Sequence, residues 1–181
     1  MVRLVYRGLS ELRGSKDIGL IILTDEAQTR QIAVVCDKHI VNQFRIRMVH
    51  EVSTARLLPE VMAKMLKEDT PNAYHLAIDA IDNGVYRAKI VNEQTLASTD
   101  IRVSDGILMS RIADYPIYME DALFDRQSVP FTPKATGMAL PINAISEDML
   151  QDALQKAIER EDYEMANQLN RELKRRKTET D

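Results

Sequence analysis

Short runs of aliphatic and β-branched residues alternate with polar segments over the first part of the chain. Residues 18–23 and 31–35 are two such runs, and the polar segment between them predicts a β-hairpin. Residues 4–10 predict a further strand before it. After the second run, apolar residues recur at a spacing of three to four, which predicts a helix that begins near Asp37.

A second helix is predicted from one apolar face, with Ser53 or Thr54 as its N-cap and Pro71 beyond its end. The residues of this face are Leu57, Leu58, Val61, Met62, Met65 and Leu66. The pair Met62 and Met65 is typical of a helix core. We therefore expect this face to be buried.

The next segment repeats the order of the first. Residues 73–81 and 85–91 predict two strands joined by a tight turn at Asn83-Gly84, because an Asn-Gly pair favours a hairpin turn. Residues 99–103 predict a third strand, and Ser104 is the expected N-cap of the helix that follows.

The two halves can be aligned element by element. The alignment places Val35 on Val103 and Asp37 on Asp105, which indicates an internal duplication of a unit of three strands and one helix. We therefore predict an α+β fold with a mixed or antiparallel sheet, helices, and a helical hairpin at the C-terminus.

Prolines and a glycine interrupt regular structure after residue 130. We expect residues 1–130 to form the α+β domain, 131–145 a linker, 146–177 a hairpin of two amphipathic helices, and 178–181 a tail. Removal of the hairpin should leave the domain folded, because few contacts are expected to cross the linker.

The hairpin carries two apolar stripes that we expect to meet near its turn, with Asp162 as the N-cap of the second helix. Short isolated helices are marginally stable in water, so the domain, a second copy or another protein should cover the remaining apolar edge. The residues expected at the centre of this protein-binding module are Leu154, Ile158, Tyr163, Ala166 and Leu169.

Composition and charge limit the classes of protein to consider. With 181 residues, of which 45% are hydrophobic, the chain suits one domain plus an appendage. Its formal net charge of -4 lacks the basic excess of a protein that wraps a duplex, so any nucleic-acid contact should be local. We expect a cytoplasmic protein with no membrane contact, because it has no long apolar run. Cys36, the only cysteine, is expected to be a buried thiol at a strand end.

Charged side chains gather where the third strand of the second half passes into its helix. Asp100, Arg102 and Asp105 lie there, and they could converge with helix N–H groups on an anion or a divalent metal. A structural role is the alternative. Asp105 is favourable in a first helical turn, and Asp100 and Arg102 face the same side of a strand, where they could pair.

Residues 100–108, Asp-Ile-Arg-Val-Ser-Asp-Gly-Ile-Leu, and 115–119, Tyr-Pro-Ile-Tyr-Met, resemble two signatures of the bifunctional nuclease family. The resemblance implies a nuclease that acts on DNA or RNA. Hydrolysis of phosphodiesters usually needs clustered carboxylates that hold a divalent metal, so magnesium or manganese is the expected cation. If the chain has a nuclease site, the expected catalytic residues are Asp100, Arg102, Asp105 and, from the other helix, Glu60.

Two positions depart from the pattern of that family. His39 stands where a glutamate is usual, and Pro59 stands where a histidine is usual. These departures leave open a second hypothesis, a non-catalytic adaptor or binding protein that keeps the nuclease fold.

Residues 150–173 resemble the UVR motif, a helical hairpin of the excision-repair proteins UvrB and UvrC that mediates contact between proteins. This resemblance implies that the hairpin binds another protein or a second copy of the chain. We therefore expect a homo-oligomer.

Overall fold

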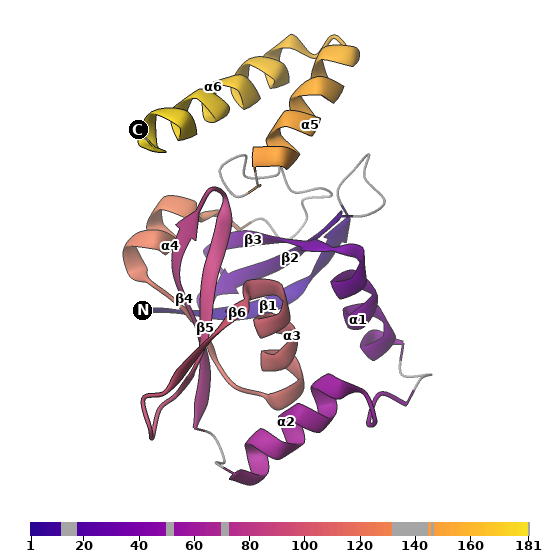
Figure 1. The fold of residues 1–181 in the computed structure, drawn as a ribbon, viewed down its shortest axis with the longest axis vertical. Helices are drawn as coiled ribbons and strands as arrows, with labels where there is room; N and C mark the ends of the chain where they lie inside the picture. The colour runs from indigo at the N-terminus through magenta and orange to yellow at the C-terminus, as the bar shows by residue number, and fades with distance from the viewer. Residues whose placement is uncertain (12–17, 50–52, 70–72, 132–144, 146, 181) are drawn as a thin grey trace.

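The fold is described from a computed structural model, for residues 1–11, 18–49, 53–69, 73–131, 145 and 147–180 (Figure 1). Its strands are β1 (Val2–Glu11), β2 (Ile18–Asp25), β3 (Arg30–Asp37), β4 (Tyr74–Asp82), β5 (Val85–Asn92), β6 (Ser98–Arg102), β7 (Ile117–Met119) and β8 (Val129–Pro130). Its helices are α1 (Lys38–Met48), α2 (Leu58–Asp69), α3 (Val103–Ala113), α4 (Asp121–Gln127), α5 (Glu147–Glu159) and α6 (Tyr163–Thr180). Among these helices, none is long and apolar enough to cross a membrane.

The strands form one mixed sheet in the order β6-β5-β4-β7-β1-β2-β3-β8. Two antiparallel units, β1 to β3 and β4 to β6, are joined through β7, which pairs antiparallel with β1 and parallel with β4. The first unit leads directly into α1 and the second into α3. The predicted α+β class and the repeated order of strand, hairpin, strand and helix are therefore confirmed.

Two local signals in the sequence fix the ends of elements. Asn83 and Gly84 both have positive φ angles, 49° and 78°, so they form the expected tight turn between β4 and β5. Asp37 is the N-cap of α1, and its Oδ1 accepts a hydrogen bond of 2.9 Å from the backbone N–H of Ile40. The predicted tight turn and the predicted start of a helix near Asp37 are confirmed.

The core joins the two halves through helices α1 and α3. The ring of Tyr6 on β1 stacks on Phe44 of α1 with their centroids 5.3 Å apart, and the guanidinium of Arg111 on α3 lies 5.0 Å from the Tyr6 centroid. Gly106 lets α3 approach β4 closely, because a Cβ there would lie 2.5 Å from Leu76 Cδ1. The two helices therefore cover the sheet as one layer.

Cys36 is buried at the end of β3, as predicted. Burial raises the pKa of its thiol to about 11, and the neighbouring charge of Asp37 adds to this rise. The thiol is therefore protonated at neutral pH and is a poor nucleophile.

The predicted cap of α3 is wrong. Strand β6 passes into α3 without an intervening turn, so Arg102 occupies the N-cap position and Ser104 lies buried inside the first helical turn. No side chain caps this end of the helix by a hydrogen bond. The backbone N–H groups at the start of α3 therefore receive no hydrogen bond acceptor from an N-cap side chain.

The predicted burial of α2 is also largely wrong. Residues 54–57 form a turn, in which the Leu57 N–H donates to the Thr54 carbonyl at 2.8 Å, and α2 begins only at Leu58. Met62 and Met65 are 46% and 59% exposed. Among the residues of α2 whose burial is described, Ala63 is buried and Leu66 is partly buried, because the helix packs on α3 through that side and lies at the edge of the domain (Figure 1).

The C-terminal hairpin has its own small core. Its buried residues are Ile145, Leu150, Ala157, Leu169 and Leu173. The Asp162 side chain accepts a hydrogen bond of 3.1 Å from the Met165 N–H, so the predicted N-cap of α6 is confirmed. Residues 132–144, which include most of the predicted linker, lie outside the described residues.

The residues expected at the centre of the hairpin fall into two groups. Leu169 is buried, and Leu154 and Ala166 are half-buried. Ile158 and Tyr163 are 50% and 71% exposed, so these two residues beside the turn lie outside the hairpin core. The physical reason is that the turn is the open end of the hairpin, which projects away from the domain (Figure 1).

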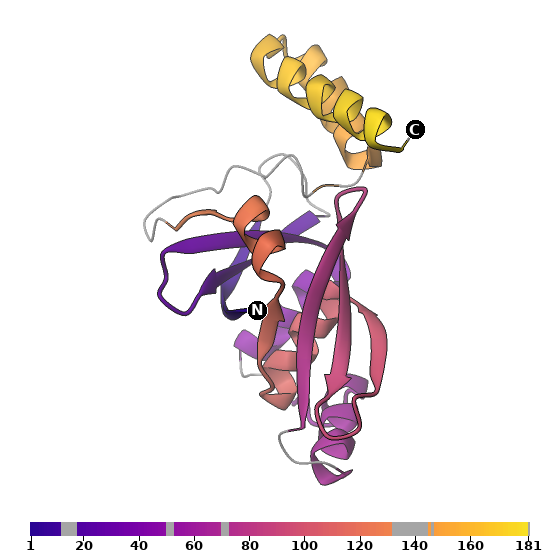
Figure 2. The same cartoon turned by 90° about the vertical axis from the view of Figure 1, so that its left-hand side faces the viewer.

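A buried arginine joins the hairpin to the domain. Arg176 is 5% exposed, and its Nη1 donates to the carbonyls of Ile145 at 2.7 Å and Asn83 at 3.2 Å. A Cβ on Gly84 would lie 2.0 Å from the Ile145 oxygen, so the glycine permits this approach. Figure 2 shows the turn between β4 and β5 reaching up to the hairpin. Contacts therefore link the hairpin to the second half of the domain.

Arg176→Met is expected to loosen this junction. The change leaves two carbonyls without their charged donor, at a cost of about 2 to 3 kcal/mol. Hydrogen exchange should become faster in α6 and in the turn at Asn83-Gly84. Arg175→Met is the matched control, because Arg175 binds the same Glu172 but its side chain is 50% exposed. Equal protection in the two variants would contradict this role for Arg176.

Candidate functional site

One arginine lies between two carboxylates where the two repeated helices begin. Arg102 Nε donates to Asp105 Oδ2 at 2.5 Å, and Arg102 Nη1 donates to Asp37 Oδ2 at 3.2 Å. Asp37 caps α1, and Asp105 lies in the first turn of α3. These three residues, which we call the Arg102 cluster, therefore join the start of α1 to the start of α3.

The cluster is charged and open to solvent. The hydrogen bond from the Ile40 N–H holds the pKa of Asp37 below its usual range, and Arg102 and His39 lower it further. The Asp105 carboxylate, followed by Asp37, raises the pKa of Arg102. The Arg102 and Asp37 side chains are 62% and 49% exposed, so their ion pair contributes only about 0 to 1 kcal/mol. Arg102 can therefore exchange a carboxylate for another anion at little cost.

Asp37 was not among the site residues predicted from the sequence. The sequence alignment of the two halves placed Asp37 on Asp105, but in the structure the counterpart of Asp37, the N-cap of α1, is Arg102, the N-cap of α3. Residues at the starts of two corresponding helices can meet when both units share one sheet. The contact with Arg102 is the evidence that they do so here.

Asp100 does not share these contacts. It lies on β6 directly opposite Lys89 on β5, whose ammonium group pairs with Asp79 at 2.9 Å. The guanidinium of Arg102 pairs with Asp37 and Asp105, although Asp100 stands two positions before it on the same strand. The structure thus brings Arg102 and Asp105 together and places Asp100 beside Lys89.

Glu60 lies in a different part of the domain. Arg47 at the C-terminal end of α1 binds both of its carboxylate oxygens, each at 2.8 Å. Glu60 and Ile112 of α3 line the same groove, and Ile112 stands about two helical turns, roughly 10 Å, beyond Asp105. Glu60 is therefore placed toward the opposite end of α3 from the Arg102 cluster.

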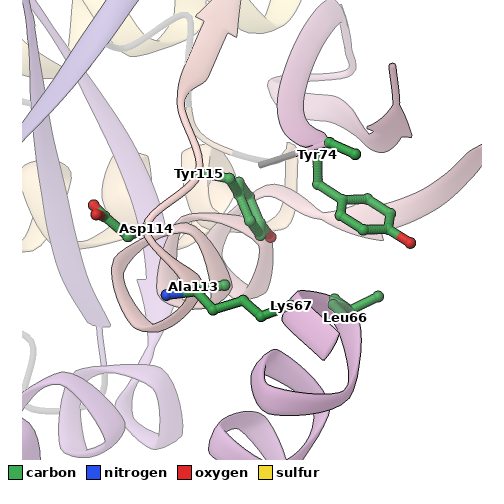
Figure 3. Close-up of a pocket in the computed structure, with 7 residues that line it drawn as sticks. Leu66, Lys67, Tyr74, Ala113, Asp114 and Tyr115 are labelled. Atoms are coloured by element: carbon green, nitrogen blue, oxygen red, sulfur yellow. The ribbon is translucent and has the colours of Figure 1, made fainter. Parts of the chain in front are cut away.

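The groove beside α2, which we call the α2 groove, is open and has a volume of about 460 Å³. Its lining residues are Ala55, Glu60, Ala63, Lys64, Lys67 and Ile112. A second hollow lies between the end of α2 and the start of β4, beside Tyr74 and Tyr115 (Figure 3). Its volume of about 20 Å³ is that of roughly one water molecule, so it is too small for a substrate.

The histidines give little support to a metal site whose ligands are all protein side chains. His39 is exposed in the first turn of α1, His75 pairs with Glu93 at 3.0 Å, and His50 lies outside the described residues. Within the described part of the chain, no three His, Cys, Asp or Glu residues are grouped to hold a metal. Asp37 and Asp105 supply carboxylate oxygens, the ligand type that Mg²⁺ prefers, and in this structure both carboxylates face Arg102.

Comparison with known proteins identifies the domain that carries this cluster. The family model described as bifunctional nuclease domain matches residues 21–132, which is more than half of the chain. The matched segment includes Asp37, Arg102 and Asp105 and ends before the hairpin. A search of curated proteins finds no match to the chain. On the strength of the domain match, the chain belongs to the bifunctional nuclease domain family.

Proposed function

We propose that the protein is a nuclease that cleaves DNA or RNA at the Arg102 cluster. The observation that carries this proposal is the convergence of two carboxylates on one exposed guanidinium at the starts of α1 and α3. An arginine beside the N-terminus of a helix favours a phosphate, and carboxylate oxygens favour a divalent cation. Membership of the family supports the class of reaction.

Each residue has a role that follows from its chemistry. Arg102 would bind a phosphate oxygen and stabilise the negative charge that develops on the phosphorus centre during attack by water. Asp37 and Asp105 would hold Mg²⁺ or Mn²⁺ against the same phosphate. When bound, such a cation supplies charge stabilisation and lowers the pKa of a coordinated water.

A second candidate function is binding of another protein without catalysis. Two observations favour it. The two ion pairs of Arg102 can serve simply to fix α1 to α3. His39 and Pro59 also depart from the sequence pattern of the family. In both cases we propose that the hairpin, which resembles the UVR motif, is a protein-docking module. The exposure of Ile158 and Tyr163 supports this role, because an exposed apolar edge is a feature of interaction sites.

Incubation of the full chain with labelled single-stranded DNA and RNA tests the nuclease proposal. We expect cleavage with magnesium or manganese and none with a chelator. Glu60→Gln should leave this activity within about twofold of wild type, because Gln still accepts from Arg47 and the residue lies away from the cluster. Absence of cleavage under every condition would favour the adaptor, and loss of activity in a folded Glu60→Gln protein would move the site to α2.

A further inference from the structure

The turn of the hairpin is an exposed surface with a defined chemical character. Residues 158–165, which we call the hairpin tip, present Ile158, Tyr163 and Met165 at 50%, 71% and 42% exposure. Its charged residues are Glu159, Arg160, Glu161, Asp162 and Glu164, so acids outnumber bases. The tip therefore combines a large aromatic side chain with negative charge.

The α2 groove has the opposite charge and a matching apolar floor. Ala55, Ala63 and Ile112 supply the floor, and the lysines Lys64 and Lys67 line it. The one acid in its lining, Glu60, is neutralised by two hydrogen bonds from Arg47. Its volume of about 460 Å³ is open to solvent, so a side chain on the surface of a partner could enter it.

These two surfaces lie far apart in one chain. The hairpin and α2 stand at opposite ends of the molecule in both views (Figures 1 and 2). Arg176 ties the far end of α6 to Asn83, which keeps the hairpin beside the turn between β4 and β5. The hairpin tip therefore cannot reach the α2 groove of its own chain and can fill only that of another chain.

We infer that the hairpin tip binds the α2 groove of a second copy of this chain, with Tyr163 on the apolar floor and the tip acids beside Lys67. This inference rests on the proposed docking role of the hairpin and names its partner. A reciprocal arrangement uses both tips and both grooves, so it closes as a dimer with two equivalent contacts. Association should weaken as salt is added, because the charged residues at the rim are exposed.

Charge reversal on each surface tests the inference by light scattering and sedimentation of the full chain. Lys67→Glu and Glu164→Lys should each weaken dimerisation at least tenfold, and the double variant should recover it, because the paired charges are exchanged. Arg126→Glu, an equal reversal on the exposed face of α4, is the control and should dimerise as wild type. Tyr163→Ser should also give monomers, with an unchanged circular dichroism spectrum because Tyr163 is exposed.

The possible outcomes separate this inference from the proposals on which it stands. A wild-type chain that is monomeric at all concentrations overturns the dimer, as does a dimer that Lys67→Glu leaves intact while Glu164→Lys disrupts it. In the second case the docking role of the hairpin survives with a different partner surface. The nuclease assay on the monomeric variants is independent, because the Arg102 cluster lies outside both surfaces.

Discussion

Asp105→Asn is expected to lower the rate of nucleic-acid cleavage by about 100-fold, since several kcal/mol of charge stabilisation are lost and each 1.36 kcal/mol is a factor of ten. Asparagine keeps the size of the side chain but removes the charge that faces Arg102. The measurement is single-turnover cleavage of a labelled substrate with saturating magnesium or manganese. Thermal melting should change little, because Arg102 is 62% exposed and keeps its ion pair with Asp37.

Asp100→Asn is the matched control for this change. It removes the same charge from a neighbouring position, but Asp100 lies opposite Lys89 and outside the Arg102 cluster. We expect activity within about threefold of wild type. If Asp105→Asn retained full activity at unchanged stability, Asp105 would not be a catalytic residue.

Leu169→Asp is expected to unfold the hairpin while the domain stays folded. Leu169 is 3% exposed and packs with Leu150, Ala157 and Leu173. Leu169→Ala should cost about 2 to 3 kcal/mol, which is a large share of the stability of so small a unit. Aspartate adds a buried unpaired charge to that loss. Hydrogen exchange should show fast exchange across α5 and α6 and unchanged protection in the sheet.

Ile158→Asp is the control for the aspartate itself. Ile158 is 50% exposed, so the same substitution there should leave both helices protected. Its effect should appear only in association with a partner. Slow exchange across α5 and α6 in Leu169→Asp would show that this residue does not hold the hairpin together.

Local signals made most of the fold predictable. The Asn83-Gly84 turn, the start of α1 near Asp37 and the Asp162 cap depend on a few neighbouring residues, so the sequence is sufficient to place them. The repeated order of elements followed from the spacing of apolar residues, which reports the period of a strand or a helix.

Features that depend on contacts between distant parts of the chain were harder to predict from the sequence. Periodicity shows that α2 has an apolar face, but it does not show that the helix meets α3 through Ala63, at the margin of that face. Met62 and Tyr163 are exposed because no described element packs over them, and periodicity does not report this. Arg102 could have paired within its own strand, and its contact with Asp37 requires both halves of the sheet to be assembled.

Binding of Mn²⁺ measured by electron paramagnetic resonance tests the central claim most directly, because it reports on the Arg102 cluster without depending on the choice of substrate. In the presence of an uncleaved oligonucleotide, the wild-type chain should bind one ion, and the double variant Asp37→Asn, Asp105→Asn should lose that binding. Equal Mn²⁺ binding by the two proteins would contradict the assignment of a nuclease centre to these carboxylates.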